Sequence, residues 1–485
     1  MKILKNNYEY ALTPILIILS FPPFNIFPLA FFAFVPLFFK LNKERSFFKL
    51  FLSGIFLNLM MFYWLEPVLT NYGGMPLPFS ILSMLLLFSV LSLFYSLPLY
   101  YYKERYLYIF PFFYLSFEIL LEYFFTGFPW GIIADSQGAN VGLNYLFNLF
   151  GVRGITLLIL FSNILIYKAL KDKRKKRLAI ILIILLFINL PGYFIKVKYE
   201  KEIKTGIVQG NEKMETVWTA DKIYKEFEKY YKYTKLCVEE GAKIVVWPEF
   251  NFPYYPRYNS SITTILRNYT KLNNIVLILG ANDMRDGKYY NTAFVFNNGE
   301  LDYYYKNHLT PFGEYIPYKK IFFFANKIAN VEGEFTKGIK LKTFEYNGIK
   351  FGIPICYEMV FPSLISSFYK KGVNLIITIT NDSWFGDTSG PHQHFHISKI
   401  RAMEGGLPVV RAATSGISGF ISSTGKTEKT LGYNKEGYLV SNIKIPRNNF
   451  SLFYKYFYLF EIIALLLGVL YFFLTFIKDK ILKKR

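Results

Sequence analysis

The chain of 485 residues has little charge and only two cysteines. Asp, Glu, Lys and Arg make up 19% of the residues, whereas 53% are hydrophobic and 20% are aromatic. A disordered chain is excluded because disorder requires low hydrophobicity, and two cysteines do not build a disulfide scaffold. The 52 Phe and 40 Tyr residues exceed what the core of an ordinary soluble enzyme can bury. The composition therefore indicates a membrane protein, or a membrane part joined to a globular part.

Apolar segments long enough to cross a bilayer, which needs about 20 helical residues, recur along the chain. We expect eight spans: residues 10–26, 29–39, 50–65, 79–102, 107–125, 143–167, 178–195 and 457–477. Three prolines (Pro22, Pro23 and Pro28) crowd the junction of the first two segments, which we interpret as a tight helical hairpin. The expected fold is therefore a membrane α-helical bundle joined to a globular domain.

Acidic residues are also scarce, since 34 Asp+Glu face 56 Lys+Arg and leave a net charge of +22. Loops 66–78 and 126–142 contain no Lys or Arg, whereas basic residues precede the first span, fill the alternate loops and close the chain. The positive-inside rule then predicts cytoplasmic termini and an extracytoplasmic segment from about residue 196 to 456. The basic charge therefore describes topology, and we expect no nucleic-acid partner.

Ionisable and aromatic residues mark two places in the spans. Glu118, Glu122 and Arg153 fall inside apolar segments, where we expect a buried Glu–Arg pair rather than a direct role with substrate. Trp64 and Trp130 stand near the predicted outer interface, where tryptophan commonly anchors a membrane protein.

The outer segment has a different pattern, which divides the chain into residues 1–198 with seven spans, a domain at 199–450, and a last span with a basic tail at 451–485. Apolar runs predict strands at residues 204–210, 243–250, 273–281, 292–299, 301–306, 350–356, 373–380, 407–413, 418–423 and 438–445. Charged amphipathic stretches between them predict helices at residues 222–240, 262–272, 363–371 and 394–404. The alternation is typical of a layered α/β domain, and AsnAsnGly at residues 297–299 predicts a hairpin turn.

Three polar residues stand at the ends of predicted strands. Cys356 ends one apolar run, Glu249 follows another, and Lys306 follows three tyrosines. Together they form a plausible nucleophile, base and cation, although a solvated strand end is the preferred interpretation of Lys306 before any motif is considered. Cys237 lies in an amphipathic helical stretch, where a free cysteine is most often a small buried hydrophobic residue.

Four motifs carry a resemblance to a known family: VVWPEF, YYYKNHLTPFGEYIP, IPICYE and TNDSWFGD. They resemble the nitrilase superfamily, whose members use a Glu–Lys–Cys triad in an αββα sandwich. The eight spans around the domain, with KNHLTPFGE and NDSWFGDTSGPHQH, are similar to the apolipoprotein N-acyltransferase family in particular.

The resemblance implies a role for each matching residue. Glu249 would be the general base, Lys306 the cation that stabilises the transition state, and Cys356 the nucleophile. Supporting or substrate-binding residues would be Trp218 in an acyl pocket, Glu314 beside the lysine, Tyr357 and Glu358 around the site, and Trp130 in the outer loop GFPWG.

The resemblance also implies a two-step reaction in a bacterial inner membrane, without a cofactor. An acyl chain would pass from a phospholipid to the cysteine as a thioester, and then to the N-terminal amine of a diacylglyceryl-cysteine lipoprotein. Two alternatives stay open: a membrane-tethered amidase or nitrilase acting on a soluble substrate, and a non-catalytic membrane scaffold or transporter.

Histidine stands at every second position in His392, His394 and His396, a spacing that suits metal ligands on a strand. The stretch at residues 392–404 has the pattern of a helix, where residues two apart point in different directions. We therefore predict a polar helix start and no metal site.

Overall fold

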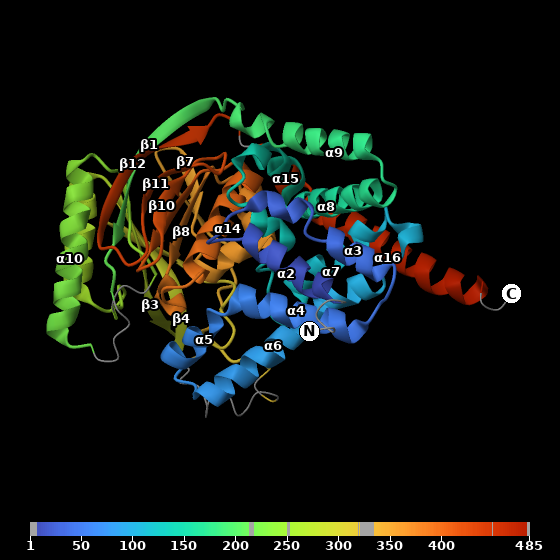
Figure 1. Cartoon of the computed structure of the whole chain (residues 1–485). Helices are drawn as coiled ribbons and strands as arrows, with labels where there is room; N and C mark the ends of the chain where they lie inside the picture. The colour runs from blue at the N-terminus through green and yellow to red at the C-terminus, as the bar shows by residue number, and fades with distance from the viewer. Residues whose placement is uncertain are drawn as a thin grey trace. The chain divides into compact units, whose positions relative to one another are not determined.

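A computed structural model describes residues 7–212, 218–249, 253–318, 320, 334–448 and 450–482. The chain divides into two compact units. The first comprises Met1–Glu66, Leu77–Ile195 and Tyr456–Arg485, and the second comprises Pro67–Pro76 and Lys196–Lys455. Figure 1 labels the elements of both.

The first unit is helical. Its longer helices are α2 (Tyr8–Ser20), α3 (Val35–Leu41), α4 (Phe47–Phe62), α6 (Leu77–Tyr100), α7 (Phe110–Tyr123), α8 (Asn144–Lys171), α9 (Lys175–Ile188) and α16 (Phe457–Leu482). Among the described residues, four segments are long and apolar enough to cross a membrane: Leu77–Tyr100, Val141–Lys171, Lys175–Tyr193 and Phe457–Phe476. A fifth is possible if Phe47–Phe62 and Leu65–Asn71, which meet at 69°, count as one span.

The remaining predicted spans form shorter helices. The first two segments appear as Tyr8–Ser20 and Phe27–Leu41, on either side of the prolines. Helix α7 covers only 14 residues of the expected fifth span, which corresponds to about 21 Å at a rise of about 1.5 Å per residue. A hydropathy pattern does not show where a helix ends, so it does not predict that these helices are short.

A buried ion-pair cluster lies inside the first unit. Arg153 of α8 donates to Glu122 of α7 and, at 2.8 Å, to Glu461 of α16. Glu118 instead accepts hydrogen bonds from Thr156 Oγ1 at 2.7 Å and from the Ile133 N–H at 3.0 Å. The predicted Glu–Arg pair is thus confirmed, with Glu461 as a further partner.

The second unit contains two six-stranded sheets. The strand order is β12-β1-β2-β3-β4-β5 in the first sheet and β11-β10-β9-β8-β7-β6 in the second. The strands of the first sheet are β1 (Tyr199–Gln209), β2 (Ile244–Val246), β3 (Val276–Arg285), β4 (Lys288–Asn297), β5 (Glu300–Tyr305) and β12 (Gly437–Pro446). Those of the second are β6 (Thr343–Tyr346), β7 (Ile349–Gly352), β8 (Leu375–Thr380), β9 (Val409–Ala413), β10 (Ser418–Ile421) and β11 (Thr427–Leu431).

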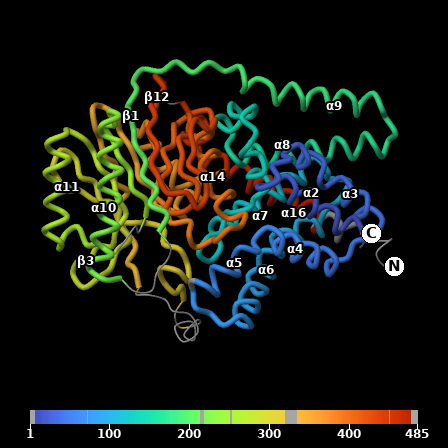
Figure 2. Tube along the Cα trace, turned by 60° about the vertical axis from the view of Figure 1, so that its left-hand side comes forward, coloured from blue at the N-terminus to red at the C-terminus, as the bar shows by residue number. Residues whose placement is uncertain are grey.

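Helices cover the outer faces of both sheets. Helices α10 (Ala220–Glu239) and α11 (Ser260–Asn273) lie together outside the first sheet, as Figure 2 shows. Helix α14 (Gly390–Gly405) packs on β9 and β10 of the second, and Phe368 of helix α13 (Pro362–Lys370) lies against Gly352 of β7. The sheets face one another, since Ser418 of β10 donates to Gln209 Oε1 of β1 at 2.5 Å. The predicted nitrilase-like αββα sandwich is therefore confirmed.

The core between α10, α11 and the first sheet is made of buried apolar side chains. It includes Tyr230 and Cys237 from α10, Leu266 from α11, and Trp247 and Leu277 from the sheet side. Burial raises the pKa of the Cys237 thiol to about 12. Cys237 is thus the buried hydrophobic residue that its helical context predicts.

Each predicted strand of the domain is present, and two further strands are added. β6 and β11 are short strands at the two edges of the second sheet. Their residues are partly exposed, so the sequence shows little of the apolar pattern that predicts a strand. The predicted hairpin joins β4 to β5, where Asn298 and Gly299 both adopt positive φ, at 50° and 87°. A two-residue turn with both φ values positive is the kind that matches the twist of paired strands.

Candidate active site

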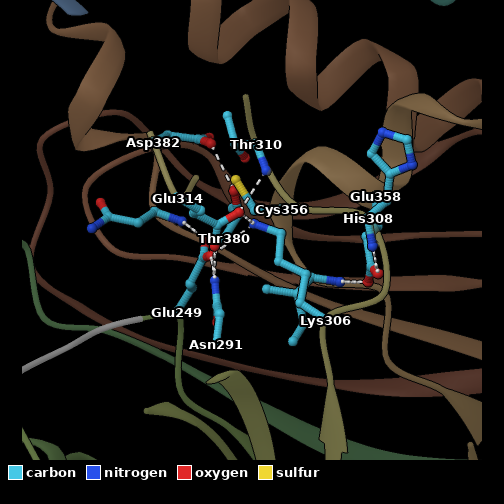
Figure 3. A network of polar contacts seen from close by, with 12 residues as sticks. Glu249, Asn291, Lys306, His308, Thr310, Glu314, Cys356, Glu358, Thr380 and Asp382 are labelled. Carbon is cyan, nitrogen blue, oxygen red and sulfur yellow. Dashed lines mark hydrogen bonds and ion pairs between the residues drawn. The ribbon is translucent and has the colours of Figure 1, made fainter. Parts of the chain in front are cut away.

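The ends of four strands bring polar residues together. Glu249 follows β2 and Lys306 follows β5 in the first sheet, whereas Cys356 follows β7 and Asp382 follows β8 in the second. In the first sheet β1, β2 and β3 are parallel, and β5 runs in the same direction because β3–β4 and β4–β5 are both antiparallel. In the second sheet β7, β8 and β9 are parallel, so within each sheet these carboxyl ends share an edge. Figure 3 shows the resulting group of side chains.

Lys306 is held between two carboxylates. Its Nζ lies 3.3 Å from Glu249 Oε1 and 2.9 Å from Glu314 Oε2, and its residue exposure is 1%. Burial alone would lower the pKa of this lysine, but Glu249 and Glu314 more than offset that effect and raise it. Lys306 therefore stays a cation, and the alternative of a solvated strand end is wrong.

Asn291 of β4 joins the same two carboxylates. Its Nδ2 donates to Glu249 Oε1 at 2.7 Å and to Glu314 Oε1 at 2.5 Å. Asn291 is fully buried. It stands between Tyr290 and Thr292, one position before the predicted strand at residues 292–299, so no local pattern marks it.

Gly280 of β3 leaves the space that the Glu249 backbone occupies. A Cβ at this position would lie 2.5 Å from Glu249 Cα and 2.8 Å from Pro248 O. A glycine inside a strand often marks such a close approach of another backbone, but the sequence does not show which segment approaches.

The other oxygen of Glu249 faces the second sheet. Glu249 Oε2 accepts the Asn381 N–H at 2.9 Å, just after β8, and the Glu249 carbonyl accepts from Thr414 Oγ1 at 3.0 Å. The position of the carboxylate is therefore fixed by groups from both sheets.

Cys356 sits on a sharp turn between β7 and the short helix at Cys356–Val360. Its φ is +51°, in the left-handed region that costs a residue with a Cβ about 1–2 kcal/mol. The residue is partly exposed, while Tyr357 and Glu358 beside it are buried. The turn thus presents the thiol at the edge of the sheets.

The thiol is protonated at neutral pH. Burial and the nearby Glu249 carboxylate raise the pKa of Cys356, and the charge of Lys306 opposes them without reversing the direction. A nucleophile in this state requires a base that removes its proton during attack. Glu249 is the carboxylate with the largest effect on this thiol.

Glu358 joins the lysine segment to the cysteine turn. Its Oε1 accepts from the Asn307 N–H at 2.6 Å, the His308 N–H at 3.0 Å and Tyr304 Oη at 2.9 Å. Its Oε2 accepts the Ile355 N–H at 2.7 Å. Burial raises the pKa of Glu358 to about 7, although the backbone N–H donors counteract this effect.

The remaining predicted residues have distinct surroundings. Glu314 also accepts the Thr310 N–H at 2.6 Å, which closes the loop after Lys306. Tyr357 packs edge-on against Phe361 with ring centroids 5.1 Å apart. Both of these residues lie in the second unit with the triad.

The two predicted tryptophans have other surroundings. Trp218 is partly buried at the margin of the core beside α10, with Lys222 Nζ 5.4 Å from its ring centroid. Trp130 belongs to the first unit, where it is buried and packs against Trp64 with centroids 5.1 Å apart. A substrate-binding role for either residue stays a prediction.

The histidine cluster begins a helix, as predicted. Helix α14 starts at Gly390, so His392 and His396 share one side of it while His394 points elsewhere. Within the residues that the structure describes, no group of three His, Cys, Asp or Glu side chains is placed to hold a metal ion. Instead His394 contacts Asp382 and the backbone of Cys356.

Comparisons with known proteins match both parts of the chain. Residues 204–448 match the carbon-nitrogen hydrolase family, and residues 14–165 match the apolipoprotein N-acyltransferase N-terminal domain. The apolipoprotein N-acyltransferase of Geobacter metallireducens is 29% identical over 91% of this chain and 90% of the relative. That of Wigglesworthia glossinidia brevipalpis is 30% identical over 88% of this chain and 89% of the relative. An amidase structure from Nesterenkonia sp. is 19% identical, with a TM-score of 0.39, over 53% of this chain and 94% of its own.

Proposed function

The chain belongs to the apolipoprotein N-acyltransferase family, and we propose that it transfers acyl chains through a thioester on Cys356. The observation that carries this proposal is the placement of the thiol, the Glu249 carboxylate and the Lys306 ammonium at one edge of the sandwich. The acyl donor is a membrane phospholipid, and the acceptor is the N-terminal amine of a diacylglyceryl-cysteine lipoprotein.

The first step acylates the enzyme. Glu249 removes the thiol proton as the sulfur of Cys356 attacks the ester carbonyl of the phospholipid. The developing oxyanion lies against the Lys306 ammonium, an interaction typically worth about 3–4 kcal/mol in the transition state. The carbon–oxygen bond then breaks, Glu249 returns the proton to the leaving oxygen, and lysophospholipid departs.

The second step transfers the acyl chain. The acceptor amine loses a proton to Glu249 and attacks the thioester carbonyl. A carbon–nitrogen bond forms, the carbon–sulfur bond breaks, and the proton returns to the Cys356 sulfur. The product is an amide, and the enzyme regains its resting thiol.

Asn291, Glu314 and Glu358 support these steps without touching the substrate. Asn291 and Glu314 fix the oxygens between which Lys306 sits, so the ammonium needs no rearrangement when charge develops. Glu358 holds the backbone on both sides of the site. Trp218 would line the acyl pocket, as the resemblance implies.

We further propose that the chain crosses the bacterial inner membrane eight times, with cytoplasmic termini and the sandwich outside. The three short helical segments would cross as part of the bundle, with bilayer thinning or adjacent loops accommodating their length. The absence of Lys and Arg from loops 66–78 and 126–142 supports this orientation. Reporter fusions to these loops and to the C-terminus give the test: a cytoplasmic signal from either loop contradicts the proposal.

The decisive experiment is mass spectrometry of the purified, detergent-solubilised protein after incubation with a defined phospholipid and no acceptor. We expect one acyl mass on the peptide that contains Cys356, and its loss when a diacylglyceryl-cysteine peptide is added. Cys237→Ala is the matched control, because it removes the other thiol and should leave acylation unchanged. An acyl group that persists in Cys356→Ala, or no acylation of the wild type, contradicts the proposal.

A further inference from the structure

A buried polar network of His394, Asp382 and Arg411 contacts the backbone of Cys356. These three residues take no part in the reaction steps described above. His394 Nε2 is 3.2 Å from the carbonyl oxygen of Cys356, and His394 Nδ1 is 2.9 Å from Asp382 Oδ1. Arg411 of β9 donates to Asp382 Oδ2 at 2.6 Å and lies 3.1 Å from His394 Nδ1. All three side chains are fully buried.

The network is firmly fixed in the fold. Arg411 also donates to the Ile417 carbonyl at 3.2 Å and to Ser398 Oγ at 3.3 Å. Gly416 provides the space for Asp382, because a Cβ there would lie 2.3 Å from Asp382 Oδ2. A site with this many directed partners constrains the imidazole ring in both position and orientation.

The partners of the ring select its proton position. The Cys356 carbonyl only accepts, so a hydrogen bond at 3.2 Å requires a proton on Nε2. Burial and the charge of Arg411 lower the pKa of His394, whereas Asp382 and the hydrogen bond to the Cys356 backbone oppose this shift. Asp382 Oδ1 lies 2.9 Å from Nδ1 on the other side of the ring, so the ring is held with Nε2 directed at the Cys356 carbonyl.

The hydrogen bond acts on the backbone next to the reacting sulfur. The Cys356 carbonyl and the Tyr357 N–H belong to one planar trans peptide and point in opposite directions. Anchoring the carbonyl therefore fixes the direction of that N–H and restrains ψ of Cys356, in the same residue that has the strained φ of +51°. Without the anchor, the turn could relax toward negative φ and carry the thiol away from Glu249 and Lys306.

We propose that His394 is a positioning residue that holds the Cys356 turn in its reactive conformation by donating from Nε2 to the Cys356 carbonyl. Asp382 and Arg411 set the orientation of the ring. The inference rests on the proposed thioester function, since it concerns the geometry of that nucleophile.

Two substitutions at His394 separate this role from simple packing. A glutamine amide nitrogen reaches about the place of Nε2 and can donate to the Cys356 carbonyl, whereas that of asparagine reaches only the place of Nδ1. The full-length protein is incubated with phospholipid over a range of concentrations, and acylation of Cys356 is followed by mass spectrometry. The apparent Tm of each variant is measured in the same detergent.

We expect His394→Asn to lower the maximal acylation rate on the order of 10- to 100-fold, as for a misplaced catalytic group. The phospholipid concentration at half-maximal rate should stay unchanged. His394→Gln should retain a rate within about 3-fold of the wild type, because it keeps the donor.

Three results overturn the inference: both variants acylate at the wild-type rate, both lose the same activity, or the loss appears only in the half-maximal phospholipid concentration. Failure of the proposed function is distinct from these, because then the wild type itself forms no thioester on Cys356. If His394→Asn does not fold, His394→Gln still decides, since loss of its maximal rate at an unchanged Tm also overturns the inference.

Discussion

A substitution at Asn291 can change a single heavy atom of the site. Asn291→Asp exchanges the NH₂ group that bridges Glu249 and Glu314 for an oxygen of the same size. At an effective dielectric constant of about 20, unit charges at the observed separations of 2.5–2.7 Å repel by about 6 kcal/mol. The new carboxyl will therefore bind a proton at neutral pH. A carboxylic acid has one O–H donor, so at most one of the two glutamates keeps its hydrogen bond.

The variant should lose one hydrogen bond to a charged group, worth about 1.5–3 kcal/mol of folding free energy. We expect an apparent Tm lower by a few degrees, and Cys356 acylation slowed by about 10-fold or more because Glu249 shifts. The loss should deepen as the pH rises from about 6 to 9, since ionisation of the new carboxyl adds repulsion. Asn297→Asp is the control: it lies on the same strand about 20 Å away, at about 3.4 Å per residue. Wild-type acylation by Asn291→Asp at high pH would refute the reasoning.

Three further predictions follow from the buried charges. Lys306→Met leaves two buried carboxylates without their cation, and should cost about 3–5 kcal/mol of stability and lower acylation about 100- to 1,000-fold; an acylation rate near wild type contradicts the assigned role. Glu358 has a native pKa of about 7, above the ordinary value of 4.5, so between these pH values the native state binds more protons than the unfolded state. The free energy of unfolding should therefore decrease by up to about 3 kcal/mol as the pH rises through this range. The Tm of the wild type should therefore fall from pH 5 to 8 relative to that of Glu358→Gln, and parallel profiles would exclude the assignment. Arg153→Met should destabilise the first unit by about 3–5 kcal/mol, measured as thermal unfolding in detergent, because Glu122 and Glu461 lose their cation; an unchanged unfolding temperature is the contrary result.

Glu249, Lys306 and Cys356 could be singled out from the sequence because each stands at the end of a predicted strand. The carboxyl ends of parallel strands share an edge within one sheet, but Cys356 follows a strand of the other sheet, so only the resemblance predicted that it lies near Glu249 and Lys306. The resemblance then assigned a role to each. The long strands of the domain were found for the same reason, since period and β-branched composition are local signals.

Residues whose role depends on tertiary contacts could not be predicted from the sequence. Asn291 and Gly280 lie inside strands and matter only because Glu249 passes beside them. Glu461 pairs with Arg153 across 308 positions of sequence, and no local pattern connects two such residues. The lengths of the helices could not be predicted because hydropathy does not show where a helix ends. The apolar run at 107–125, for example, forms a helix only over Phe110–Tyr123.

The division of the site between two sheets has a consequence for biosynthesis. Glu249, Lys306 and Glu314 precede every strand of the second sheet in the sequence, whereas Cys356 follows β7 of that sheet, and β12, which completes the first sheet, is synthesised last. Until the second sheet docks, the thiol lacks its base and its cation, and the N–H of Asn381 that holds Glu249 is missing. Under the proposed function, a partly folded chain therefore cannot form the thioester, and acyl transfer begins only when both sheets are complete.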